Sequence, residues 1–495
     1  MKKVAIIGSG IGAISLSIRL SNLGYDVDVY EKNSYPGGKL TTIKSGKYSF
    51  DAGPQLFTMP TYVDELFELS GENPRKFFNY KRKEIGCKYF WEDGIELCAY
   101  SDQNKFVKEV NLKLGVDKNI LKSYLKKAKK KYELSTKIVL EKSLHKLSTF
   151  FSKDVLKAIL NFRLFEFFKT LSKVNQQQLK EKHLIQFYNR FATYIGSSPY
   201  KTSGIMTVIQ HLESHFGTFF PEGGLRMITN VLVELAERKN VNFIYNTVVT
   251  EILCEKNNVV GVQINGNTKK KYEIVISNMD IYFTYEKLLK NIKTPYRVKN
   301  VNSSSSALIF YWGINDSFEN LELHNIFFSK DYKKEFNSIF NEMEFCDDPT
   351  IYLSITSKDN PSDAPVGCEN WYVMINTHYD SDHDWEDLAK RYRKIIIKKI
   401  ERVLGKHIEK NIVSEEILSP KTIFERTQSY RGALYGPSSN ETFSAFHRHP
   451  NFTNKLNNLY FCGGSVHPGG GIPMCLLSAK IVSTLISQKY NSKVL

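Results

Sequence analysis

The stretch Val4-Ala5-Ile6-Ile7-Gly8-Ser9-Gly10-Ile11-Gly12-Ala13 stands at the start of the chain and decides its fold. The four apolar residues before Gly8 predict a buried parallel strand. Apolar residues then recur at largely helical spacing as far as Leu23, and Gly24 predicts the end of this helix. Asp26 to Glu31 alternates as a second strand. A strand, a helix and a strand in this order predict a βαβ unit.

The same stretch fits the dinucleotide fingerprint G-x-G-x-x-G/A. Gly8 permits the tight turn, Gly10 lets the backbone approach a pyrophosphate, and Ala13 lets the helix pack on the sheet. The start of the helix offers free N–H groups to phosphates. Glu31 can accept both ribose hydroxyls, which disfavours a 2′-phosphate and hence NADP. A glycine-rich turn without chemistry would explain the glycines, but not the ordered strands, helix and acid.

The segment Pro36-Gly37-Gly38-Lys39 favours FAD over NAD. A glycine pair soon after the acidic residue lets the chain double back beside the pyrophosphate, and Lys39 brings a positive charge near it. Taken alone, the pair would be another turn.

Composition limits the remaining possibilities. A chain of 495 residues exceeds what one core usually supports, so two or three domains are expected. Seven cysteines without a C-x-x-C pair argue against a disulfide framework and against a metal site, and favour a reducing cytosol. Met1-Lys2-Lys3 and the apolar run after it imitate a secretory signal, but the glycines and Arg19 oppose export. Apolar runs long enough to span a membrane are absent from the sequence.

The pattern along the chain changes several times. Lysine becomes dense and glycine sparse from about residue 80 to 196, which predicts a helical insertion. Strand-like runs at Val259–Ile264 and Glu273–Ser277 are expected to continue the first sheet. The predicted domains are a discontinuous FAD-binding domain (1–75, 205–290 and 425–495), a substrate domain (76–120 and 291–424) and a helical lobe (121–204).

Further motifs carry a resemblance to a known family. Asp51-Ala52-Gly53-Pro54, Phe220-Pro221-Glu222-Gly223-Gly224 and the segment from Asn458 to Pro473 resemble the bacterial-type carotenoid desaturases, FAD enzymes related to phytoene desaturase. Arg190-Phe191-Ala192-Thr193-Tyr194-Ile195-Gly196, followed by Ser198-Pro199-Tyr200, is similar to the 1-hydroxycarotenoid 3,4-desaturase branch.

The resemblance implies an α/β fold: a Rossmann-like FAD-binding domain of the glutathione-reductase/amine-oxidase type, a mixed α+β substrate domain and a helical lobe. It implies a C-3,4 double bond made in a 1-hydroxylated acyclic or monocyclic carotenoid, with hydride transfer to flavin N5 and reoxidation by oxygen or a quinone. The expected cofactor-binding residues are Gly8, Gly10, Gly12, Ala13, Glu31, Lys32, Gly37, Gly38, Lys39, Gly53, Pro54, Val248, Val249, Gly463, Gly464, Gly471, Ile472 and Pro473.

Residues for the chemistry itself are harder to select. His467 lies inside the flavin-facing motif and is the candidate proton acceptor, although a hydrogen bond to backbone would explain it equally well. Arg190, Tyr194 and Tyr200 are candidates for holding the end group of the substrate, or else form a packed helix end. A phytoene-type desaturase, a carotenoid isomerase, a flavin amine oxidase and a non-redox isoprenoid-binding protein remain alternative functions.

A net charge of +16 raises the question of an anionic partner. Phenylalanines and leucines lie among lysines from Leu144 to Leu171, as expected of a helix that lies on an anionic membrane. The lysines of Lys122–Lys131 would add attraction. A core helix with a solvated lysine face would look similar, and no nucleic-acid motif accompanies the charge. The expected place is therefore the cytoplasm, at the inner face of the cell membrane.

Overall fold

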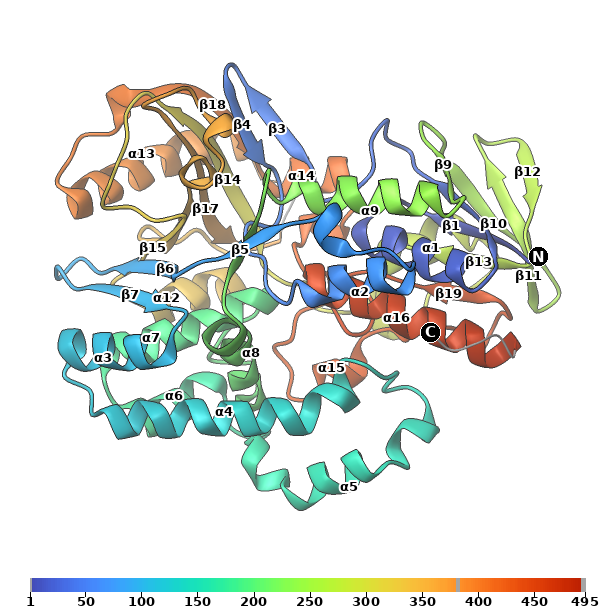
Figure 1. Ribbon diagram of the computed structural model, residues 1–495, viewed down its shortest axis with the longest axis horizontal. Coiled ribbons are helices and arrows are strands. Elements are labelled where there is room, and N and C mark those ends of the chain that lie inside the picture. The colour runs from blue at the N-terminus through green and yellow to red at the C-terminus, as the bar shows by residue number, and fades with distance from the viewer. Residues whose placement is uncertain (1, 380–382, 491–495) are drawn as a thin grey trace.

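The computed structural model describes residues 2–379 and 383–490 (Figure 1). Its first sheet has five parallel strands in the order β19-β13-β1-β2-β9. They are β1 (Lys3–Ile7), β2 (Asp26–Tyr30), β9 (Asn242–Ile244), β13 (Ile274–Ser277) and β19 (Leu459–Phe461). The predicted βαβ unit is confirmed, since helix α1 (Ile11–Asn22) connects the parallel strands β1 and β2.

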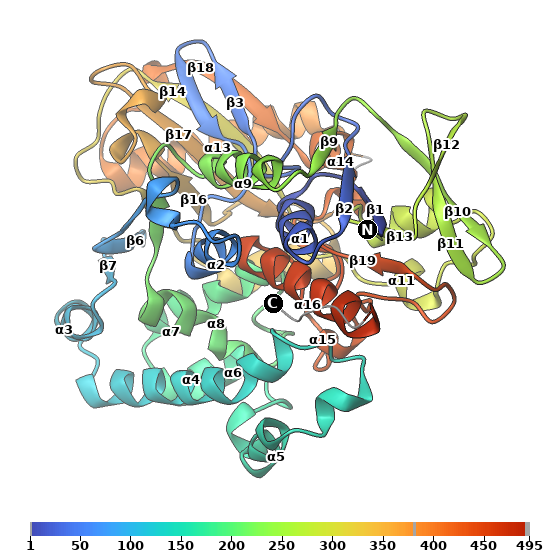
Figure 2. The same cartoon turned by 45° about the vertical axis from the view of Figure 1, so that its right-hand side comes forward.

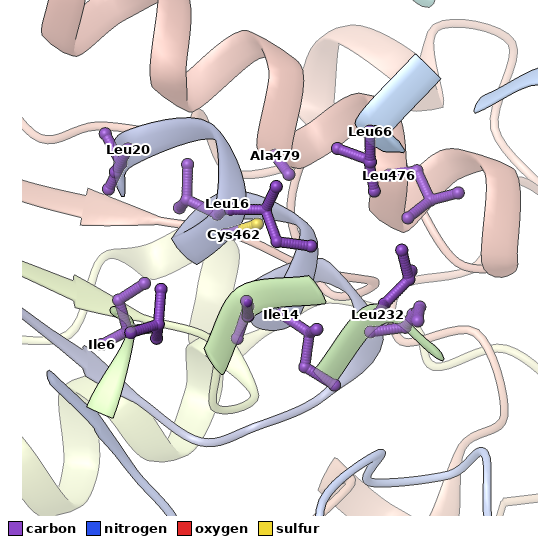
Figure 3. Close-up of a cluster of buried hydrophobic side chains, with 14 of the residues drawn as sticks. Ile6, Ile14, Leu16, Leu20, Leu66, Leu232, Cys462, Leu476 and Ala479 are labelled. Carbon is purple, nitrogen blue, oxygen red and sulfur yellow. The ribbon is translucent and has the colours of Figure 1, made fainter. Parts of the chain in front are cut away.

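Four helices cover one face of this sheet. They are α1, α2 (Thr61–Leu69), α9 (Arg226–Arg238) and α16 (Ile472–Tyr490). Figure 3 shows the side chains that join them, and its labelled residues are Ile6, Ile14, Leu16, Leu20, Leu66, Leu232, Cys462, Leu476 and Ala479. The first and last helices of the chain therefore share one core.

The other face carries a separate antiparallel sheet, formed by β10 (Val249–Glu255), β11 (Asn258–Ile264) and β12 (Thr268–Lys271). The expectation that Val259–Ile264 continues the first sheet is wrong. Only two residues connect β10 to β11, and so short a connection lets the strands pair only antiparallel.

A seven-stranded mixed sheet has the order β18-β14-β17-β16-β15-β6-β7. Its strands are β6 (Ile85–Phe90), β7 (Glu96–Tyr100), β14 (Ser306–Ile314), β15 (His324–Phe327), β16 (Ile351–Ser354), β17 (Glu369–Thr377) and β18 (Ile412–Leu418). Helix α13 (Trp385–Leu404) packs on one face, where it meets alternate residues such as Phe310 and Val373. The residues between them, such as Ile309 and Tyr372, face the interior.

Helices of the lobe lie below both sheets in Figure 1. They are α3 (Gln103–Leu114), α4 (Lys118–Val139), α5 (Lys153–Leu160), α6 (Leu171–Leu179) and α7 (Lys182–Asn189). The helical prediction from residue 80 onward is wrong for its first part, because β5 (Tyr80–Arg82), β6 and β7 lie there. Their apolar residues alternate and were overlooked beside the lysines. The exact domain boundaries stay a prediction.

The remaining elements are short. They are β3 (Thr42–Ser45), β4 (Tyr48–Asp51), β8 (Phe219–Pro221), α8 (Ile209–His211), α10 (Ile281–Phe283), α11 (Tyr296–Lys299), α12 (Tyr332–Asn337), α14 (Pro420–Thr427) and α15 (Ser444–His447). Across residues 2–379 and 383–490, none of the helices is both long and apolar enough to cross a bilayer.

Candidate functional site

A cavity of about 710 Å³ extends from the carboxyl ends of the parallel strands to the interior face of the seven-stranded sheet. With the exception of Ala13, every residue expected to bind the cofactor contributes to its lining. Ala13 is fully buried in the core between α1 and the sheet. The structure thus brings together motifs from both ends of the chain.

Asn278 joins the two glycine motifs and was missed by sequence reasoning. A Cβ atom built on Gly10 would lie 2.6 Å from its Oδ1, and one on Gly463 would lie 2.6 Å from its Nδ2. Its Nδ2 also donates to the carbonyl of Cys462 at 2.9 Å. Asn278 directly follows β13, so its position at the carboxyl edge of the sheet was the available signal.

Glu31 is held at this edge by three donors. Its carboxylate accepts hydrogen bonds from the backbone N–H and the hydroxyl of Ser9, each at 2.9 Å, and from the N–H of Asn33 at 2.9 Å. A carboxylate has about four acceptor positions, so capacity remains for a ligand hydroxyl.

The turn at Gly37 is built around Arg226. The Nη1 of Arg226 donates to the carbonyls of Pro36 at 2.7 Å and Leu40 at 2.9 Å, and a Cβ on Gly37 would lie 2.7 Å from this atom. Lys39 donates to the carbonyl of Leu434 at 2.8 Å, and burial lowers the pKa of its ammonium. These contacts within the protein account for a glycine at this turn independently of any phosphate.

The start of helix α16 is open toward the cavity. Gly471 has a φ of +108°, which favours glycine, and a Cβ built there would meet no atom within 4 Å. Pro473 lies in the first turn of the helix, where its missing N–H costs nothing. The helix therefore presents its positive end to free space in the cavity.

Among the residues that the structure describes, Arg448 is a buried cation without an acidic partner. Its side chain lines the cavity, and the residue is 5% exposed. Its Nη2 donates to the carbonyl of Pro437 at 2.8 Å and to the hydroxyl of Ser439 at 3.3 Å, while its Nη1 has no partner. Burial lowers the pKa of this guanidinium to about 10. Because buried charges are normally paired, Arg448 and the open glycine loops fit an anionic dinucleotide such as FAD.

His467 does not line the cavity. It is fully buried, and its Nε2 lies 3.0 Å from the carbonyl of Lys142, the backbone bond that was the alternative interpretation. Burial lowers the pKa of His467 to about 4. Its position and its weak basicity both disfavour a role as proton acceptor.

We expect His467→Gln to keep the rate of flavin reduction within about twofold of the native rate, because an amide can donate to the same carbonyl. The substitution also changes acid stability. The histidine pKa of 6.5 falls to about 4 on folding, so the unfolded chain takes up the proton first and stability is lost as pH falls from 6.5 toward 4. Urea unfolding across this range should show a loss smaller by up to ~3 kcal/mol in the variant. His407→Gln, at an exposed position, is the control.

Arg190 and Tyr194 line the cavity, whereas Tyr200 does not and packs against Phe336. The Nη2 of Arg190 donates to the hydroxyls of Tyr89 at 2.6 Å and Tyr194 at 3.1 Å, and forms an ion pair with Glu213 at 3.5 Å. Tyr194 also donates to Glu213. Glu213 was missed by sequence reasoning. Its carboxylate pairs with Arg190 and Tyr194, so much of the hydrogen-bonding capacity of these two candidate substrate-binding residues is already used within the protein.

The far half of the cavity is largely apolar. Apolar residues such as Leu140, Ile209 and Leu212 face alternate residues of β15, β16 and β17, including His324 and Tyr352. The hydroxyl of Tyr352 lies 2.9 Å from Nδ1 of His324, and burial lowers the pKa of this imidazole to about 3. No group of three metal-ligating side chains occurs in the described part of the chain. The cavity can hold a dinucleotide at one end and a long hydrocarbon at the other.

Comparisons with known proteins agree with this geometry. A family model described as flavin containing amine oxidoreductase matches residues 14–487. A 1-hydroxycarotenoid 3,4-desaturase from Flavobacterium sp. (strain P99-3) is 49% identical over 98% of this chain and 99% of its own. A 4,4′-diaponeurosporene oxygenase from Staphylococcus aureus (strain bovine RF122 / ET3-1) is 30% identical over 99% and 98%. The crystal structure of an oxidoreductase from Methanosarcina mazei has the same fold, with a TM-score of 0.64, 14% identity and coverage of 97% and 99%.

Proposed function

Because this chain belongs to the flavin-containing amine oxidoreductase family, with FAD as its cofactor, we propose that it introduces a C-3,4 double bond into a 1-hydroxylated acyclic or monocyclic carotenoid. The observation that carries the proposal is that one continuous cavity has dinucleotide-type glycine loops at one end and hydrocarbon walls at the other. The identity of 49% to a desaturase of this specificity supports the same assignment.

We assign the predicted cofactor residues to FAD, with Ser9, Asn278 and Arg448 added. Ser9 orients the carboxylate of Glu31, and Asn278 holds the two glycine loops together. Bound FAD would supply a centre that accepts a hydride. Ala13 serves the site only through packing.

The task of the protein at the hydrocarbon end is positioning. An unactivated C–H bond loses a hydride more readily when the remaining positive charge spreads over a polyene, so the walls must hold the chain in place and keep water away. Among the described lining residues the carboxylates are Glu31 and Asp280, and both belong to the dinucleotide end. The apolar walls therefore surround the developing charge without a carboxylate nucleophile.

Incubation of the FAD-loaded protein with a 1-hydroxylated carotenoid tests the proposal. The expected product is two hydrogens lighter and absorbs at longer wavelength, and the same carotenoid without the hydroxyl should react more slowly. An unchanged mass would assign an isomerase instead, and a gain of oxygen would assign an oxygenase. Measuring turnover with oxygen or with a membrane quinone identifies the electron acceptor.

A surface patch around helix α5, here called the docking patch, supports contact of the protein with the inner face of the cell membrane. Helix α5 contains no buried residue, and it lies at the lower edge of the molecule in Figures 1 and 2. The exposed apolar residues of the patch are Phe150, Phe151, Leu156, Ile159, Leu160, Phe162 and Phe168. Lys153, Lys157, Arg163 and Lys169 are exposed among them. A helix of the core would bury its apolar face, so the alternative interpretation does not fit.

The docking patch is continuous with the mouth of the cavity. Phe167 lines the cavity and packs against Phe443 with ring centroids 6.2 Å apart. Phe443 and Phe446 also line the cavity and are about 40% exposed. Lys131 was expected to add attraction to an anionic membrane, but it is buried and forms an ion pair with Glu166 at 2.7 Å, so it does not face the membrane. A carotenoid could pass from a bilayer into the cavity without crossing water.

Replacing Leu156, Ile159 and Leu160 together by serine should weaken binding to anionic vesicles at least tenfold, about 1.4 kcal/mol, because three apolar side chains no longer enter the interface. Flotation with phosphatidylglycerol-containing liposomes measures the effect. Val366→Ser, at a fully exposed position outside the patch, is the matched control. Failure of the native protein to float with these vesicles would contradict the proposal.

A further inference from the structure

We infer that Arg448 provides the positive charge that stabilises the FAD when it is reduced. The inference rests on the proposed function only in placing FAD in this cavity, and it requires no carotenoid. Its starting point is the unpaired charge of Arg448. In the described part of the chain, each of the other buried lysines and arginines forms an ion pair, as Lys131 does with Glu166 and Arg190 with Glu213.

Within residues 2–379 and 383–490, Arg448 has no negatively charged partner. Its two hydrogen bonds go to a carbonyl and a hydroxyl, which are neutral, and its Nη1 is buried without any acceptor. Burial alone accounts for its lowered pKa, and no neighbouring carboxylate contributes. A full positive charge held in this way is unfavourable unless a ligand brings a negative charge.

The position of Arg448 indicates which part of FAD it would contact. A Cβ built on Gly469 would lie 3.1 Å from its Cζ, so the guanidinium packs directly against the loop that leads into α16. This loop belongs to the segment from Asn458 to Pro473, the motif that the family resemblance describes as flavin-facing. The phosphate-type turn lies elsewhere, at Gly8 to Gly12, where the start of α1 supplies the positive field. Reduction by a hydride adds negative charge to the flavin, and a fixed cation nearby favours that state.

Two measurements on Arg448→Met test the inference. The midpoint potential of bound FAD, determined by dye-coupled titration without substrate, should fall by at least about 30 mV, a tenfold change in the equilibrium constant of a two-electron couple. The affinity for oxidised FAD should change less than tenfold, because the oxidised ring carries no net charge. Arg448→Lys should restore most of the potential, and Arg297→Met, at an exposed position, should leave it unchanged.

The stability of the cofactor-free protein separates this role from a structural one. Removing an unpaired buried charge should leave the urea midpoint of apo Arg448→Met equal to or above that of the native apo protein. A midpoint potential equal to the native value would overturn the inference. So would a loss of affinity for oxidised FAD greater than tenfold, which would assign Arg448 to the pyrophosphate. Neither result would affect the desaturase assignment, which depends on product mass.

Discussion

Gly10→Val is expected to yield a purified protein without flavin absorbance, with an affinity for FAD at least a hundredfold weaker, about 2.7 kcal/mol. A Cβ at this position would already lie 2.6 Å from Oδ1 of Asn278, and valine adds two methyl groups. Gly10 also precedes the first turn of α1, so these methyl groups would cover the N–H groups that are expected to bind phosphate. Fluorescence titration with FAD measures the loss.

Gly46→Ala is the matched control for Gly10→Val. Gly46 lies in the turn between β3 and β4 and does not line the cavity, and a Cβ there would meet no atom within 4 Å. Its positive φ costs folding about 1–2 kcal/mol, but FAD binding should not change. Native FAD affinity in a folded Gly10→Val protein would show that the cofactor lies elsewhere.

Arg190→Met is expected to lower the free energy of unfolding by about 3–5 kcal/mol, because it leaves the carboxylate of Glu213 buried without its cation. Glu213 is only 6% exposed, and its remaining partner is the hydroxyl of Tyr194. Adding Glu213→Gln to the same protein should recover part of the loss, since the neutral amide needs no counter-charge. Urea unfolding of both variants measures the coupling.

A surface ion pair provides the comparison for this effect. Lys105→Met removes the partner of Glu84 at a position where both side chains are more than half exposed, and should lower the free energy of unfolding far less than Arg190→Met does. If Arg190→Met instead unfolds like the native protein and loses only its preference for hydroxylated carotenoids, Arg190 is a substrate anchor. That result would contradict the structural role given to the Arg190–Glu213 pair.

The parts of the fold that sequence reasoning predicted depend on local interactions. The first strand, its glycine turn and helix α1 follow one another within twenty residues, so periodicity and turn chemistry are sufficient. The sheet membership of Val259–Ile264 was wrong because a run of apolar residues does not reveal its pairing partner. Strands β6 and β7 were overlooked because lysine content dominated the interpretation of that region.

The candidate site likewise has features that local sequence patterns predict and features that depend on contacts between separate elements. The glycine loops could be found because their spacing is local, whereas the roles of Arg448, Asn278 and Glu213 depend on contacts between separate elements of the fold. Glu213 lies only 23 positions from Arg190. The pairing of the two becomes visible only when the segments that carry them, Arg190–Ile195 and Leu212–Phe216, pack together. The unpaired state of Arg448 is an absence, and an absence of partners can be seen only in three dimensions.

The order of strands in the parallel sheet has a consequence for biosynthesis. Strand β1 occupies the middle of that sheet, but its neighbour β13 is covered on the far side only by β19, which begins at residue 459. A nascent chain on the ribosome therefore displays an unpaired edge at β13 until residues 459–461 have been synthesised, and it lacks α16 until residues 472–490 follow. A chain that stops before residue 459 is therefore expected to leave this edge of β13 unpaired and to lack the part of the site that β19 and α16 provide.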